Sequence, residues 1–156
     1  MITLTRHVRL AFGLRRPGDA APEARGVNGY GGVPALGGLP RHYEFEVRCS
    51  GEVHPTHQYL IDIKAIDRAV RASVYPLVDR ACQDPAADPL RTALDASAAL
   101  ASHLGPTFAA MRWWLSPFYS LEVEADMPAA VLVRQRFDFA ASHRLFVASL
   151  SPEENL

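Results

Sequence analysis

Few residues of this chain could take part in metal or proton-transfer chemistry, and they are scattered. The chain has six histidines and two cysteines among 156 residues. His143 follows residues 137–141, which are apolar except for Asp138. Neutral imidazole is a common zinc ligand, but a catalytic zinc uses three protein ligands and keeps a fourth position open. A lone histidine after a strand is usually a structural residue, so the meaning of His143 depends on the motif around it.

The other histidines and the cysteines are weaker candidates. His54 and His57 form an H-x-x-H pattern around Pro55, and a solvated turn is the favoured interpretation. Cys49 and Cys82 form no C-x-x-C pair. We expect both to be small buried hydrophobic residues with free thiols, as in a reducing cytosol.

Composition excludes several function classes. The net charge is −1 without a long basic run, so nothing favours a nucleic-acid partner. No apolar run approaches the ~20 residues that span a bilayer, and the N-terminus lacks a signal-sequence pattern. The glycines of residues 26–38 match no phosphate-binding pattern. We therefore expect a cytoplasmic protein without a membrane or nucleic-acid partner.

Alternating apolar residues predict the strands that would position these side chains. In residues 42–50, Tyr43, Phe45, Val47 and Cys49 share one face. A turn over residues 51–57 and a short strand over 59–61 would complete a β-hairpin. Residues 15–40, rich in glycine and proline, predict a long loop. Further strands are expected at residues 3–14, 119–125 and 130–139.

Helical spacing predicts three helices between these strands. The first begins at the N-cap Asp62 and ends near Pro76 or shortly after it. A second covers residues 90–104, and a third begins at Pro106. The apolar face of the second helix would bury Leu90, Leu94, Ala98 and Leu104. The buried face of the third would consist of Phe108, Met111, Trp114 and Leu115. We expect Trp113 and Trp114 to lie in the core and at an interface. Strands, then helices, then strands predict an α+β domain with an antiparallel sheet.

The C-terminal segment carries the most specific motif. Residues 136–145 read R-F-D-F-A-A-S-H-R-L, and residues 150–156 read L-S-P-E-E-N-L. This resembles the opening of the 6-pyruvoyl-tetrahydropterin synthase / 6-carboxy-tetrahydropterin synthase family, F-x-A-x-H-x-L followed by E-E-N. In that family the histidine is the first of three zinc ligands, and an H-G-H motif supplies the others. The resemblance therefore implies that His143 is a zinc ligand.

The middle of the chain resembles the same family over roughly residues 40 to 125. The matching segments read R-H-Y-E-F-E-V (41–47), G-E-V-H-P (51–55), L-I-D-I-K (60–64), P-L-V-D-R (76–80), P-T (106–107) and Y-S-L-E-V (119–123). The resemblance implies the family's T-fold, an antiparallel sheet with two to three helices packed on one face. It also implies a catalytic role for Asp79, which falls at the family's D-H dyad.

This part of the chain departs from the family at its functional positions. Leu39, Pro40 and Arg41 stand where the family has H-G-H, and Arg80 replaces the histidine beside Asp79. Ala109 and Ala125 stand at two family glutamates, with Glu124 adjacent to the second. Residues 8–15 can be laid over 137–144, which places Leu14 opposite His143. We interpret residues 1–126 as a degenerate copy and residues 130–156 as the first strand of a second, truncated copy.

The resemblance implies an enzyme, a zinc-dependent lyase that acts on 7,8-dihydroneopterin triphosphate in queuosine or pterin biosynthesis. Zinc would polarise the oxygens of the substrate side chain. Family members are homo-oligomers, trimers or hexamers, whose sheets join into a barrel. The alternative is a non-catalytic structural domain that supports an active one. The zinc site is incomplete in this chain, because one histidine cannot hold the metal.

Overall fold

The chain folds around one five-stranded antiparallel sheet. The computed structural model describes residues 1–13, 40–56, 58–140 and 147–155. The strands lie in chain order, each antiparallel to the next: β1 (Ile2–Phe12), β2 (Arg41–Gly51), β3 (Phe108–Ser116), β4 (Tyr119–Glu124) and β5 (Leu132–Gln135). The predicted loop 15–40 lies, except for Pro40, outside the described residues.

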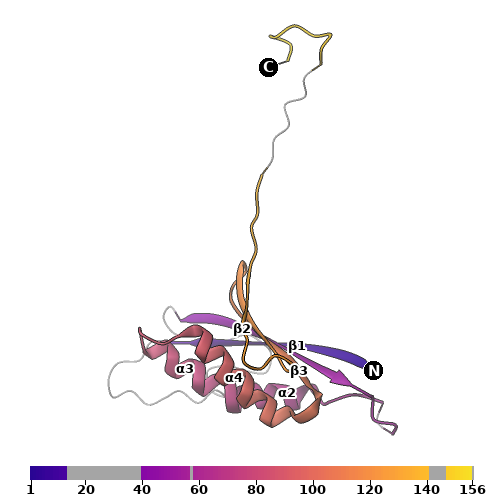
Figure 1. Cartoon of the computed structure of the whole chain (residues 1–156), viewed down its shortest axis with the longest axis vertical. Helices are drawn as coiled ribbons and strands as arrows, with labels where there is room; N and C mark the ends of the chain where they lie inside the picture. The colour runs from indigo at the N-terminus through magenta and orange to yellow at the C-terminus, as the bar shows by residue number, and fades with distance from the viewer. Residues whose placement is uncertain (14–39, 57, 141–146, 156) are drawn as a thin grey trace.

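Helices inserted between β2 and β3 cover one face of this sheet (Figure 1). They are α2 (Ile63–Ala69), a π-helical segment (Val70–Val74), α3 (Tyr75–Gln83) and α4 (Pro89–Leu104), followed by a 3₁₀ turn (Gly105–Thr107). The predicted α+β class, with an antiparallel sheet and helices on one face, is confirmed. No helix among the described residues is long and apolar enough to cross a membrane.

The core lies between the helices and the sheet face that they cover. The register places Val8, Phe45, Trp113 and Leu121 in one row across four strands, and all four are buried. Phe45 is fully buried, which stabilises the fold by about 2–3 kcal/mol. Cys49 and Cys82 are buried free thiols, as predicted. The predicted facing of Phe45, Val47 and Cys49 is confirmed as well.

The first helical region begins as predicted but runs past its expected end. The Asp62 carboxylate accepts a hydrogen bond from the Lys64 N–H at 2.9 Å, so Asp62 is the N-cap. Pro76 lies in the first turn of α3 instead of ending the helix. A proline ring normally clashes with the carbonyl four residues earlier. Here the preceding turn is a π-helix, whose wider i→i+5 spacing changes the position of that carbonyl.

Two predicted elements are wrong. Residues 59–61 form no strand, because β2 pairs with β1 and β3 and so has no free edge for a hairpin partner. The helix expected from Pro106 is strand β3, in which Phe108, Met111 and Trp113 face the core and Trp114 faces away. Sheet pairing on both sides of this segment outweighs the helical spacing of its apolar residues.

The predicted apolar stripe of α4 is mostly wrong. Leu90 is 42% exposed, and Leu94 is only partly buried, whereas Leu104 is buried as expected. The buried face consists of small residues and two leucines, namely Ala93, Ala96, Ser97, Leu100 and Leu104. Small side chains let α4 approach both the sheet and the neighbouring helices closely, so close packing decides which face is buried.

The strand expected at residues 130–139 is shorter than predicted. β5 is confined to Leu132–Gln135 and pairs with β4 at the edge of the same sheet. Residues 136–140 extend away from the body of the molecule (Figure 1). Phe137 and Phe139 are 76% and 89% exposed there. The division into residues 1–126 and 130–156 stays a prediction.

Candidate functional site

Of the two residues predicted to carry chemistry, only Asp79 falls within the described residues. It lies in α3 and is 5% exposed, close to Cys82. The Gln83 side chain donates a hydrogen bond to the Asp79 backbone carbonyl at 3.4 Å. Burial keeps this carboxyl group away from solvent. His143 lies outside the described residues.

Arg41 lies next to Cys82 at the start of β2. Its guanidinium donates a hydrogen bond from Nη1 to the Cys82 carbonyl oxygen at 3.4 Å. Burial raises the pKa of the Cys82 thiol, although the nearby Arg41 opposes this effect. Burial also raises the pKa of Tyr43. Both groups therefore stay protonated near neutral pH, which makes Cys82 a poor nucleophile.

The zinc that the resemblance implies needs three ligands that can be brought together. Arg41 occupies one of the three H-G-H positions, and a guanidinium is a permanent cation that cannot bind Zn²⁺. Across residues 1–13, 40–56, 58–140 and 147–155, no three histidine, cysteine or acidic side chains are arranged to hold a metal ion. The described residues therefore do not fit a zinc centre.

The sheet face opposite the helices carries a network of charged side chains centred on Glu122. Glu122 is 1% exposed and accepts hydrogen bonds from Arg48, Arg112 and Arg134. The Nε atoms of Arg112 and Arg134 lie 2.9 Å and 2.6 Å from Oε2. Burial acts to raise the pKa of Glu122, but the hydrogen bonds from Arg112 and Arg134 outweigh it, so the pKa is lowered.

Two further glutamates balance the arginines. Arg112 lies 3.5 Å from Glu46, which also accepts a hydrogen bond from the Trp114 indole N–H at 3.2 Å. Arg48 lies 3.3 Å from Glu124. Both carboxylates are thus held by permanently charged guanidinium groups. The network joins β2, β3, β4 and β5, and its role is structural.

This network was not predicted from the sequence. The alternation of Ser120, Glu122 and Glu124 against apolar residues was visible and indicated a polar strand face. The burial of Glu122 was not visible, because it depends on arginines from three other strands. Arg112 was also hidden by the mistaken helix assignment.

A second ion pair, between Arg6 and Asp67, lies on the helix side of the sheet. Arg6 of β1 donates from Nε and Nη2 to the two carboxylate oxygens of Asp67 in α2, both at 2.9 Å. Asp67 is 3% exposed. The bidentate geometry fixes α2 against the sheet.

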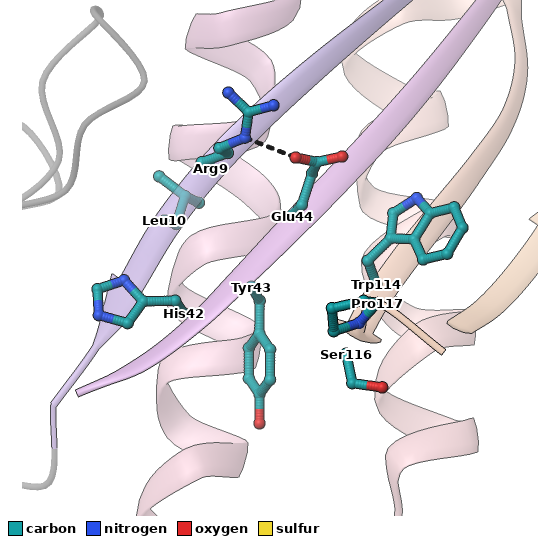
Figure 2. Close-up of a pocket in the computed structure, with 8 residues that line it drawn as sticks. All are labelled: Arg9, Leu10, His42, Tyr43, Glu44, Trp114, Ser116 and Pro117. Carbon is teal, nitrogen blue, oxygen red and sulfur yellow. Dashed lines mark hydrogen bonds and ion pairs between the residues drawn. The ribbon is translucent and has the colours of Figure 1, made fainter. Parts of the chain in front are cut away.

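A pocket of about 430 Å³ opens where β3 separates from β2 (Figure 2). The β2–β3 register begins at Glu44 opposite Trp114, and β3 has an irregularity between Trp114 and Ser116. Figure 2 shows the pocket residues on three strands with the helices behind them. The lining residues are Arg9, Leu10, His42, Tyr43, Glu44, Trp114, Ser116 and Pro117.

Comparison with known proteins gives a structural likeness but no match in sequence families. No protein-family model matches the chain, and no curated protein matches it. A solved structure that it resembles is 6-pyruvoyl tetrahydropterin synthase from Caenorhabditis elegans, with a TM-score of 0.42 and 13% sequence identity, over 87% of this chain and 96% of that one. At this identity and TM-score the likeness supports no statement about function. The resemblance to the tetrahydropterin synthase family therefore rests on the sequence motifs alone.

Proposed function

We propose that residues 1–126 form a non-catalytic domain of the tetrahydropterin synthase type that supports a catalytic unit beginning near residue 130. The observation that supports this proposal concerns Arg41, which stands at a family ligand position and donates a hydrogen bond to the Cys82 carbonyl oxygen. Asp79, at the family's proton-transfer position, is buried in α3. In this proposal the domain keeps the architecture of the family and has lost the groups that would bind zinc and move protons.

The C-terminal segment supports the second part of the proposal. Phe137 and Phe139 are largely exposed and lie two residues apart, so in an extended strand they share one face. When residues 8–15 are laid over 137–144, these phenylalanines fall opposite Val8 and Leu10, which are core residues of the first unit. In a second unit these two phenylalanines would be core residues. They are exposed here because, among the described residues, no other core residues of that unit pack against them.

A second candidate function is favoured by the F-x-A-x-H-x-L motif around His143. The protein would then be a zinc-dependent lyase acting on 7,8-dihydroneopterin triphosphate, with His143 as one ligand and the missing ligands from another polypeptide. Bound zinc would supply Lewis-acid polarisation of the substrate. None of the described residues completes such a site. The product, 6-carboxy- or 6-pyruvoyl-tetrahydropterin, is left open.

Metal content and turnover of the purified 156-residue chain separate the two candidates. We expect well under one zinc per chain by elemental analysis and no turnover of 7,8-dihydroneopterin triphosphate. Near-stoichiometric zinc that disappears in His143→Ala, but not in the surface variant His103→Ala, would overturn the structural proposal and favour the lyase. Turnover by the chain alone would have the same consequence.

Assembly is part of the proposal. β5 continues the sheet beyond β4, so a strand that follows the first unit takes the next place along the sheet. β1 has a free outer edge among the described strands. Repetition of a head-to-tail edge contact produces a closed ring when the rotation closes. We therefore propose a homo-oligomer, a trimer or hexamer, built by joining these edges.

A further inference from the structure

The pocket beside Trp114 has features of a ligand site, and neither Asp79 nor Arg41 lines it. Arg9, Glu44 and Trp114 are direct neighbours in one row of the sheet, on the face opposite the helices. His42, two residues before Glu44, is on the same face and at the rim of the pocket (Figure 2). The volume of about 430 Å³ lies within the range that holds small ligands.

The carboxylate of the pocket, Glu44, is already paired with neighbouring side chains. Glu44 accepts a hydrogen bond from Arg9 Nε at 2.6 Å and lies 2.7 Å from His7 Nδ1. Burial acts to raise the pKa of Glu44, but these two neighbours outweigh it and lower the pKa. Glu44 is thus an ionised carboxylate whose charge is balanced, and it offers little to a cationic ligand.

The two basic side chains of the pocket, Arg9 and His42, have hydrogen-bond donors that are not used within the described residues. Arg9 uses only Nε in its bond to Glu44, and Figure 2 shows its two terminal nitrogens directed away from that carboxylate. Within the part of the chain that the structure describes, those nitrogens and the His42 ring make no hydrogen bond. Both side chains can donate to an anion, and a hydrogen bond from arginine to a carboxylate is strong because both partners are charged.

The opposite wall of the pocket is formed by Trp114 and Pro117, which are apolar, and the orientation of the indole is held by its neighbours. The Trp114 indole is anchored by its N–H bond to Glu46 and by the Arg112 guanidinium, 5.4 Å from the ring centroid. Pro117 lies beside it in the pocket lining. An indole held in one orientation next to a proline gives a surface on which a flat apolar group can pack at little entropic cost.

We propose that this pocket binds a small aromatic carboxylate, with its carboxylate on Arg9 and His42 and its ring against Trp114 and Pro117. The occupied state of Glu44 favours an anion over an aromatic cation. The fixed indole gives a flat aromatic ring a surface to pack on. This inference does not depend on the proposed function, because none of its residues belongs to the implied metal site.

The test compares two probes of the same shape, 2-naphthoate and neutral 2-naphthamide, by NMR titration of the ¹⁵N-labelled full chain. We expect 2-naphthoate to move the Trp114 indole N–H signal, assigned with Trp114→Phe, and to bind at least tenfold more tightly than the amide. Arg9→Gln should remove this preference. Arg91→Gln, which loses an exposed arginine paired with Asp95 on α4, should keep it.

His42→Ala gives a second test that leaves the Arg9–Glu44 pair intact. We expect it to weaken 2-naphthoate binding several-fold without changing the melting temperature, because His42 is exposed. Equal affinities for acid and amide would overturn the proposal. So would a Trp114 signal that does not respond to the acid, or 2-naphthoate affinity that both Arg9→Gln and His42→Ala leave unchanged.

Discussion

Glu122 shows how a single buried charge can depend on residues from several strands. Its carboxylate is 1% exposed and satisfied by three arginines. Glu122→Gln would leave those guanidinium groups without their shared anion, and because they are partly exposed to solvent the cost is about 1–3 kcal/mol. We expect the free energy of unfolding in urea to fall by this order. Glu52→Gln, at an exposed carboxylate, should change it by less than about 0.5 kcal/mol.

The same residue predicts a pH dependence. The pKa of Glu122 is lower in the folded protein than the ~4.3 of an unfolded chain. A lowered folded pKa stabilises the fold above the unfolded pKa, and this contribution is lost as the pH falls through the folded pKa. Melting temperatures measured from pH 7 to pH 3 should therefore decline more steeply in the wild type than in Glu122→Gln. Parallel curves would contradict this assignment.

The Arg6–Asp67 pair allows a test of how a buried ion pair contributes. Arg6→Met alone would leave a carboxylate that is 3% exposed without its bidentate partner, at a cost of about 3–5 kcal/mol. Arg6→Met with Asp67→Leu removes both charges and should recover much of that loss. Urea unfolding of the two single variants and the double variant gives the coupling energy. Additive losses would show that the pair does not act as a unit.

At the scale of elements, Gly105 separates α4 from β3. Its φ of 61° and ψ of −146° lie in a region that is almost restricted to glycine. We expect Gly105→Ala to lower the free energy of unfolding by about 1–3 kcal/mol. Gly13→Ala is the matched control, because a Cβ there meets no atom within 4 Å and its φ is not in the positive range. Equal effects of the two substitutions would contradict the role of Gly105.

The elements also show what the sequence could predict. Strands with strict alternation, such as β2 and β4, were predicted to within a residue or two, because one face must be buried. The segment after Gly105 was not, since Phe108, Met111 and Leu115 satisfy helical spacing equally well and only pairing with β2 and β4 decides between the two. The end of the first helix was placed too early, near Pro76, for a similar reason. Residue types do not reveal the π-helical turn that accommodates this proline.

At the scale of the whole molecule, the site was less predictable than the fold. Asp79 was picked out by its motif, yet whether a carboxylate at that position is open or buried is set by how α3 packs. The pocket beside Trp114 arises from an irregularity in β3 and brings together residues from three strands. Such sites depend on long-range register, which periodicity in a single sequence does not specify.

The proposed assembly gives a prediction about the extended segment after β5. Arg136 is 68% exposed in the single chain, so trypsin should cut after it readily in a monomer. If neighbouring chains join edge to edge, this segment lies against another sheet, and cleavage at Arg136 should slow as protein concentration rises. We expect light scattering to give a trimer or hexamer over the same range. If the free edge of β1 and the segment beyond β5 meet between chains, mass action makes both the measured mass and the cleavage rate depend on protein concentration. A monomer mass at every concentration, with cleavage at a constant rate, would therefore show that these two parts do not meet.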